Sequence, residues 1–162
     1  MKKLVYRAPE AVQDREAMDA IARDDVERLR TLPIDLGFNH ENWHFIQEVC
    51  VRLSGHSDVW IRANSLLGLS YAARFRGQLE KNVVKPVLLR GLKDTDEHVA
   101  GTAADVISDI NQLLGWRIAG ARVQKAIEKR YEEKRTANQA PLPTPGKCPS
   151  SNHSQPPGMA HL

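Results

Sequence analysis

Residues 40–44 read His-Glu-Asn-Trp-His, and their types and spacing are those of a catalytic metal site. In an H-E-x-x-H pattern on a helix, two imidazoles one turn apart bind Zn²⁺, and the glutamate between them activates a water molecule for hydrolysis. His40 and His44 would be the ligands here, and Glu41 the general base. The chemistry that this pattern would support is therefore zinc-dependent hydrolysis.

The surroundings of this motif favour a different interpretation. We expect His40 in the first turn of a helix. Both histidines would lie on the side opposite the apolar stripe of residues 45–53, and would therefore face solvent. Glu48 lies two turns from His40, about 12 Å along the axis, too far to share a metal ion with it. His56 is the other candidate ligand, in a turn of uncertain direction. We therefore expect surface histidines and no metal, with adventitious metal binding and a zinc hydrolase as alternatives.

Other catalytic patterns do not stand out. We find no glycine-rich phosphate loop, nucleophilic serine elbow or Cys/His pair, so we expect neither enzyme activity nor a cofactor. Cys50 lies in an apolar helical run and Cys148 in a Pro/Ser-rich stretch, a pattern that fits reduced thiols. Residues 1–10 are too polar for a secretory signal, and no run approaches about 18 uncharged apolar residues. These features predict a soluble, cytoplasmic protein.

The composition of the chain and the positions of its helix-capping and helix-breaking residues predict an all-α fold. Aromatic residues make up 6% of the sequence, and Ala, Leu, Glu, Arg and Lys, which favour helices, are common. Pro33 is expected to end the second helix and Asn39 to cap the third. The expected helices, about six to seven, are residues 9–22, 24–32, 39–53, 59–74, 80–92, 97–114 and 119–135. Residues 1–139 thus form the predicted domain, and residues 140–162, rich in Pro and Ser, a predicted disordered tail.

An internal repeat is the strongest pattern in the sequence. Residues 57–69 align without a gap with residues 95–107 at a spacing of 38, and the helices before them align at 39. Capping residues match capping residues, and small or apolar residues match on the inner stripe. The matched pairs are Ser57 with Thr95, Asp58 with Asp96, Ile61 with Val99, Ser65 with Ala103 and Leu69 with Ile107. A helical pair that recurs at this length predicts a short, right-handed α-solenoid of stacked hairpins.

Residues 57–69, which read SDVWIRANSLLGL, resemble the second-helix signature of HEAT repeats. They share an Asp in the turn, then a Val/Ile-Arg pair, then small and Leu residues. The resemblance covers residues 40–116 well and the terminal helices poorly, and Ala100 stands where the second copy should have its Arg. It implies a HEAT-like solenoid in which Arg62 reaches the Asp of an adjacent turn.

In HEAT proteins the second helix of each pair lines a concave face, and that face usually binds the partner. Helical spacing places the non-core residues of these two helices on that face. The expected partner-binding residues are Trp60, Asn64, Tyr71, Arg74, His98, Thr102, Asp105 and Asp109. Trp, Tyr and Arg are common binding anchors. The alternative is that Trp60 packs beneath a neighbouring repeat and that the other residues are only solvated.

The chain is also similar to the small, stand-alone HEAT-like immunity proteins of bacteria. These antitoxins neutralise a toxin in competition systems such as contact-dependent growth inhibition. The resemblance implies a cognate toxin domain, such as a nuclease, as the protein partner, and a monomer outside the toxin–immunity complex. An adaptor or assembly factor would share the same size and composition.

Nucleic-acid binding is the alternative from another class. Residues 117–135 carry seven Lys or Arg against three Glu, whereas residues 1–60 carry eight against eleven acidic residues. The basic stretch could follow a phosphate backbone, either passively or as in HEAT-like alkylpurine DNA glycosylases. Asp105 and Asp109 on the expected groove would repel that backbone. We therefore expect a protein partner rather than a nucleic acid or a membrane.

Overall fold

The computed structural model describes residues 6–139, which form seven helices and no strand. The helices are α1 (Asp14–Ala22), α2 (Val26–Asn39), α3 (Trp43–Leu53), α4 (Val59–Arg76), α5 (Lys81–Leu92), α6 (Glu97–Leu114) and α7 (Ala121–Asn138). The predicted all-α, solenoid-like fold is confirmed. The predicted disordered tail, residues 140–162, lies outside the described residues. Among the helices of the described part, none has the length and apolar character needed to cross a membrane.

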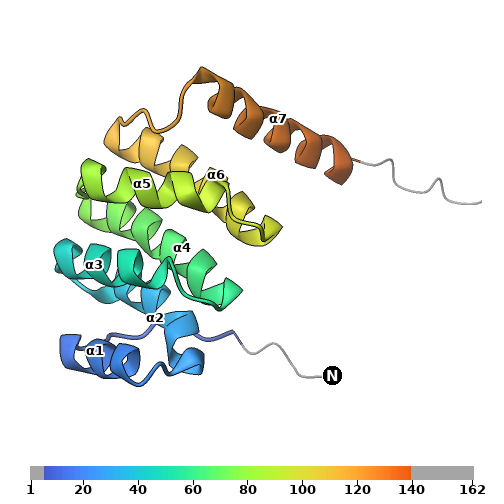
Figure 1. Ribbon diagram of the computed structural model, residues 1–162. Coiled ribbons are helices and arrows are strands. Elements are labelled where there is room, and N and C mark those ends of the chain that lie inside the picture. The colour runs from blue at the N-terminus through green and yellow to red at the C-terminus, as the bar shows by residue number, and fades with distance from the viewer. Residues whose placement is uncertain (1–5, 140–162) are drawn as a thin grey trace, which may run out of the picture.

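The helices are arranged in two layers. In one layer α4 packs between α2 and α6, and in the other α3 covers α4 while α5 covers α6. Figure 1 shows the stack with α1 at one end and α7 projecting from the other. The pairs α3–α4 and α5–α6 are the two hairpins that the 38-residue spacing predicted.

Aspartate side chains start the second helix of each pair. Asp25, Asp58 and Asp96 each accept a hydrogen bond from a backbone N–H in the first turn of α2, α4 and α6, respectively. Glycines in the left-handed region end two of these helices, Gly77 at φ 67° and Gly115 at φ 65°. Since residues with a Cβ avoid this conformation, glycine is the usual residue after a helix end.

The core lies between the two layers and is built from aliphatic side chains. Its largest fully buried members are Leu29, Leu32, Leu36, Ile46, Val49, Ile61, Leu66, Leu69, Leu88, Ile107, Ile110 and Ile118. Cys50 is also fully buried, and desolvation raises the pKa of its thiol, which keeps it protonated and unreactive.

Glycines allow α4 to approach α2 and α3 closely. A Cβ on Gly68 would lie 2.6 Å from Cys50 Sγ and 2.7 Å from the Pro33 carbonyl oxygen. A Cβ on Gly37 would lie 2.8 Å from Tyr71 Cβ. The close spacing of α2 and α4 therefore requires residues without a Cβ at positions 37 and 68.

Arginine–aspartate pairs join successive turns of the stack. Arg62 binds both carboxylate oxygens of Asp94, at 2.9 and 3.1 Å, and its remaining nitrogen donates to two backbone carbonyls. Arg30 makes a similar pair with Asp58, the N-cap residue of α4, at 2.7 Å. The predicted role of Arg62 is confirmed. In α6 the corresponding position is Ala100. Because alanine is uncharged, the series of Arg–Asp pairs does not continue from this position toward α7.

Three predicted helix boundaries are wrong. Pro33 lies inside α2, which continues to Asn39 because its apolar residues on both sides of the proline are buried. Asn39 therefore ends α2, and the residue that caps α3 is Asn42, whose side chain accepts from two backbone N–H groups. The first helix begins at Asp14, not at Pro9.

Candidate protein-binding surface

The outward residues of α4 and α6 lie side by side, as the repeat predicted. Contacts between their side chains establish this: Trp60 packs against His98 with 4.8 Å between ring centroids, and Ser70 donates a 2.9 Å hydrogen bond to Asp109. We call the eight predicted residues on these helices the α4–α6 surface. They are Trp60, Asn64, Tyr71, Arg74, His98, Thr102, Asp105 and Asp109.

Trp60 is the most exposed aromatic residue of the α4–α6 surface, with 53% of its area accessible. Its ring packs against that of the neighbouring His98 at an interplanar angle of 55°. The alternative in which Trp60 lies beneath an adjacent repeat is therefore wrong. Its indole leaves a large apolar area exposed to solvent.

Two polar residues of this surface are used inside the protein. Asn64 Nδ2 donates a 2.6 Å hydrogen bond to the Arg30 carbonyl and so connects α4 to α2. Thr102 is buried, and its hydroxyl donates to the His98 carbonyl at 2.8 Å. The hydrogen bonds of these two side chains are therefore made within the protein.

The two aspartates of the surface already have partners within the chain. Asp109 accepts from the Ser70 hydroxyl and lies 3.6 Å from the Arg74 guanidinium. Asp105 accepts a 2.7 Å hydrogen bond from the Tyr131 hydroxyl of α7. Burial, followed by this hydrogen bond, raises the pKa of Tyr131, so the phenol stays a donor.

A depression of about 510 Å³ lies between α6 and α7 on the same side. It is lined by His98, Thr102 and Asp105 of the α4–α6 surface and by Arg130 and Lys134 of α7. The last helix therefore adds basic side chains beside the predicted residues, which the repeat alone did not indicate.

Three aromatic rings meet where α2 and α4 end. The Phe38 centroid lies 4.4 Å from that of Tyr71 and 5.2 Å from that of Phe75, and Tyr71 and Phe75 are 6.3 Å apart. Phe38 is 38% exposed and Phe75 is 45% exposed. We call Phe38, Tyr71 and Phe75 the aromatic cluster. It extends the α4–α6 surface onto α2.

Sequence reasoning missed Phe38 and Phe75. Phe75 follows Tyr71 by four residues and so lies on the same helix face, a signal that was present in the sequence. Phe38 was missed because α2 was expected to end at residue 32. Only the continuation of α2 past Pro33 brings Phe38 against Tyr71.

The HENWH segment does not form a helical metal motif. His40 follows the end of α2, where its Nε2 lies 2.6 Å from Asp14 and its Nδ1 accepts from the Asn42 N–H. His44 lies in α3, and its ring stacks on Trp43. The expectation that His40 belongs to the first turn of the helix is wrong, because Asn42 supplies the cap. Within residues 6–139, no group of three or more His, Cys, Asp or Glu side chains could hold a metal ion.

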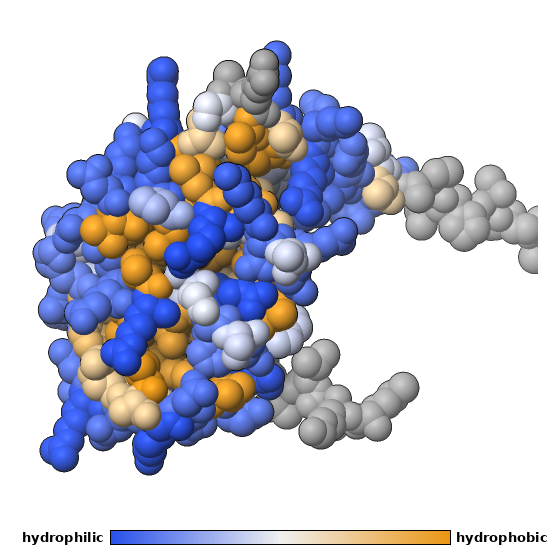
Figure 2. Space-filling view, viewed as in Figure 1, coloured by the Kyte–Doolittle hydropathy of each residue, from blue (hydrophilic) through white to orange (hydrophobic). Residues whose placement is uncertain are grey.

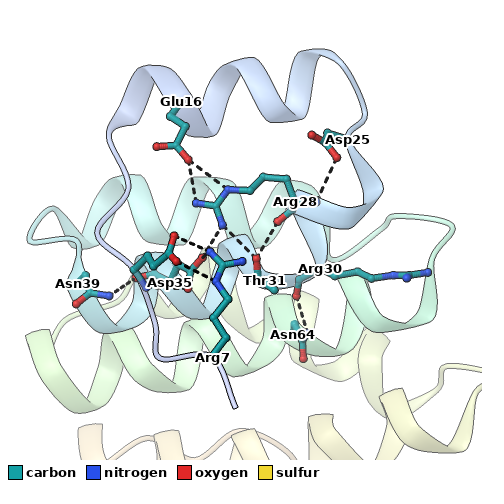
Figure 3. Close-up of polar contacts among 10 residues, drawn as sticks. Arg7, Glu16, Asp25, Arg28, Arg30, Thr31, Asp35, Asn39 and Asn64 are labelled. Atoms are coloured by element: carbon teal, nitrogen blue, oxygen red, sulfur yellow. Dashed lines mark hydrogen bonds and ion pairs between the residues drawn. The ribbon is translucent and has the colours of Figure 1, made fainter. Parts of the chain in front are cut away.

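A charged network fixes the first helix to α2 (Figure 3). Asp35 is only 3% exposed. Its carboxylate accepts a 2.6 Å hydrogen bond from Arg28 Nη1 and a 3.1 Å hydrogen bond from the Glu10 N–H. Arg28 also pairs with Glu16 of α1 at 3.0 Å, and Figure 3 shows Arg7 beside Asp35. Because these buried charges are paired and hydrogen-bonded, their role is structural.

The exposed cations of α7 do not form an unbroken basic stripe. Lys125, Lys129, Arg130, Lys134 and Arg135 alternate with Glu128, Glu132 and Glu133. Lys129 lies 3.8 Å from Glu133. This mixture favours a solvated helix with basic positions over a track for phosphates.

In comparisons with known proteins, no family model, curated protein or solved structure matches this chain.

Proposed function

We propose that this chain is a protein-binding module of the HEAT type, and that its partner covers the aromatic cluster and the adjoining α4–α6 surface. The observation that carries the proposal is the aromatic cluster itself. Phe38 and Phe75 are exposed and contact Tyr71, and tyrosine is among the residues enriched in binding hot spots. Burying a large apolar side chain stabilises a complex by about 1.5–3 kcal/mol, so several neighbouring rings supply a substantial part of an affinity.

The charged residues beside the cluster give this surface specificity. Arg74 and Asp109 have half-exposed side chains and are 3.6 Å apart, a weak pair that a partner's charges can replace. Asp109 is then available to a basic group, and Arg74 to a carboxylate. Complementary charges of this kind set orientation and association rate more than affinity.

The partner, in this proposal, is a toxin domain such as a nuclease, and the chain is the immunity protein that neutralises it. The resemblance of residues 57–69 to the HEAT signature supports the proposal, as does the similarity to small HEAT-like immunity proteins. Asp105 and Asp109 also support it, since a nuclease surface built to hold phosphates is basic.

Parallel captures test the proposal. The full chain, a Phe38→Ser/Phe75→Ser variant and a Tyr6→Ala control are used as baits, since Tyr6 is an exposed aromatic residue, 87% accessible, outside the cluster. The partner should be retained by the full chain and the control, and lost with the cluster variant. Expression of that partner alone should arrest bacterial growth, and co-expression of the chain should restore it. A partner retained equally by the cluster variant contradicts the binding surface, and a partner that is harmless alone contradicts the immunity function.

A further inference from the structure

A second hollow surface lies where α7 meets α5 and α6, and it shares Arg130 with the depression beside the α4–α6 surface. A groove of about 360 Å³ runs between α5, α6 and α7, and we call it the α5–α7 groove. Leu89 and Leu92 of α5 and Val123 and Ile127 of α7 supply apolar walls. Figure 2 shows apolar side chains reaching the surface of the stack near the start of α7. Since one water molecule occupies about 30 Å³, this groove has room for side chains.

The groove continues along α5 into a larger cavity. That cavity, of about 770 Å³, shares Leu89 and Lys93 with the groove and extends to Arg90 and Ser54. The shared residues make the two hollows neighbours on one surface. An elongated segment, rather than a single small molecule, matches this extent.

Apart from Asp94, which is paired with Arg62, the charged side chains that line the two hollows are basic. Arg90, Lys93 and Arg130 line the two hollows, and α5 contains no acidic residue. Arg90 donates to the Ser54 hydroxyl at 2.7 Å, and none of these three cations forms a salt bridge among the described residues. Arg62 also lines the cavity, but all three nitrogens of its guanidinium already donate to Asp94 or to backbone carbonyls. The cations at the rim are thus available to carboxylates.

We propose that the α5–α7 groove binds a short acidic segment of another protein, with apolar side chains inserted between α5 and α7 and carboxylates on Arg90, Lys93 and Arg130. An amphipathic helix that lays its apolar face in a groove is a common mode of recognition. The groove contains none of the eight residues of the α4–α6 surface and none of the aromatic cluster, so its binding can be tested apart from the proposed function.

The same features argue against other occupants. Residues 140–162 of this chain contain no Asp or Glu, so they cannot supply side-chain carboxylates to the rim. A sugar–phosphate backbone has no apolar side chain to fill the space between Leu89, Leu92 and Ile127, and its phosphates carry the charge. The occupant therefore combines acidic and apolar side chains.

Peptide probes test the proposal on the full chain. The first is a fluorescein-labelled peptide of about four helical turns with Leu at every third or fourth position and Glu elsewhere. The second has the same composition with the Leu spacing broken, and the third has Lys in place of Glu. Fluorescence anisotropy should give the first peptide a Kd at least about tenfold lower than those of the other two. Equal binding of the broken-spacing peptide, or of the Lys peptide, overturns the proposal.

Variants of the groove locate the binding. Lys93→Glu should weaken binding of the first peptide about tenfold, and Ala126→Trp should block the groove by filling it from α7. Lys85→Glu is the matched control, since Lys85 is an exposed cation of the same helix that lines neither hollow. Melting curves confirm that each variant is folded. Binding that Lys93→Glu and Lys85→Glu weaken equally reflects general charge attraction and overturns the proposal.

Two further measurements distinguish peptide binding in the α5–α7 groove from binding at the aromatic cluster and from self-association. Phe38→Ser/Phe75→Ser should bind the first peptide as the full chain does. Loss of peptide binding in the groove and loss of partner binding at the aromatic cluster are therefore measured separately. Light scattering on the full chain tests a second copy as occupant. Self-association that Lys93→Glu abolishes would show that another copy fills the groove, which overturns the proposal.

Discussion

The rings of Phe38 and Tyr71 lie 4.4 Å apart between centroids, at an interplanar angle of 48°. Phe38 belongs to the last turn of α2 and Tyr71 to α4, so this contact joins two helices while leaving Phe38 38% exposed. Together with Phe75, it places an apolar patch at the surface beside the α4–α6 surface. Phe38 and Phe75 therefore lie outside the buried core.

The aromatic cluster should therefore matter little for folding. Phe75→Ala removes a ring that is 45% exposed, and we expect the free energy of unfolding to fall by less than about 1 kcal/mol. Urea denaturation measures this value. A loss of about 3 kcal/mol or more, as for truncation of a core Phe, would make Phe75 a core residue instead.

The Arg62–Asp94 pair should contribute substantially to stability. Arg62→Ala leaves two backbone carbonyls without this donor and leaves the Asp94 carboxylate with the Asp96 N–H alone, so we expect a loss of about 1–3 kcal/mol in the free energy of unfolding. Arg62→Lys should recover only part of it, because an ammonium cannot bind both carboxylate oxygens in a fork. Full recovery with Lys would show that charge alone acts here.

The same pair predicts a dependence of stability on pH. The hydrogen bond from Arg62 lowers the pKa of Asp94 in the folded protein below its unfolded value of about 3.9. A lowered pKa stabilises the fold above the unfolded pKa, and this contribution is lost as the pH falls through about 3.9 toward the folded pKa. Denaturation at a series of pH values should show stability falling in this range, and Arg62→Ala should flatten the fall. An equally steep fall in the variant would assign it to other carboxylates.

Gly68 should not tolerate a methyl group. The Cβ of Gly68→Ala would meet Cys50 Sγ at 2.6 Å and the Pro33 carbonyl at 2.7 Å, so α4 must move away, at a cost of about 1–3 kcal/mol. Gly101→Ala is the matched control, since a Cβ there meets no atom within 4 Å and alanine favours the helix. Thermal melting should show a lower Tm for the first variant and an equal or higher Tm for the second. Equal melting of both would contradict the close packing of α4.

The HENWH segment should play no catalytic part. Because His40 and His44 do not share a helix and have different neighbours, we expect elemental analysis to find far less than one zinc per chain. A chelator should leave the Tm unchanged, and Glu41→Ala should change no activity of the protein. Stoichiometric zinc, or a Tm that falls on chelation, would contradict this prediction.

The sequence predicted most of the stack because its signals are local. The caps at Asp58 and Asp96, and the ladder residue Arg62, act within or between adjacent turns of a repeat. The end of α2 was predicted wrongly at Pro33. The helix continues because residues on both sides of the proline are buried, and this tertiary effect cannot be read from the positions of Pro and Gly in the sequence. The contact between Tyr131 and Asp105 was also out of reach, because it depends on how α7 crosses α6.

Isothermal titration calorimetry of the purified partner tests the proposed binding surface most directly. Tyr71→Ala and Phe75→Ser are compared with the full chain and with Tyr6→Ala, after melting curves have confirmed folding. We predict that at least one cluster variant loses about 2 kcal/mol or more, a Kd increase of about 30-fold, while Tyr6→Ala binds unchanged. Unchanged affinity in both folded cluster variants would contradict the proposed surface and move the interface to another face.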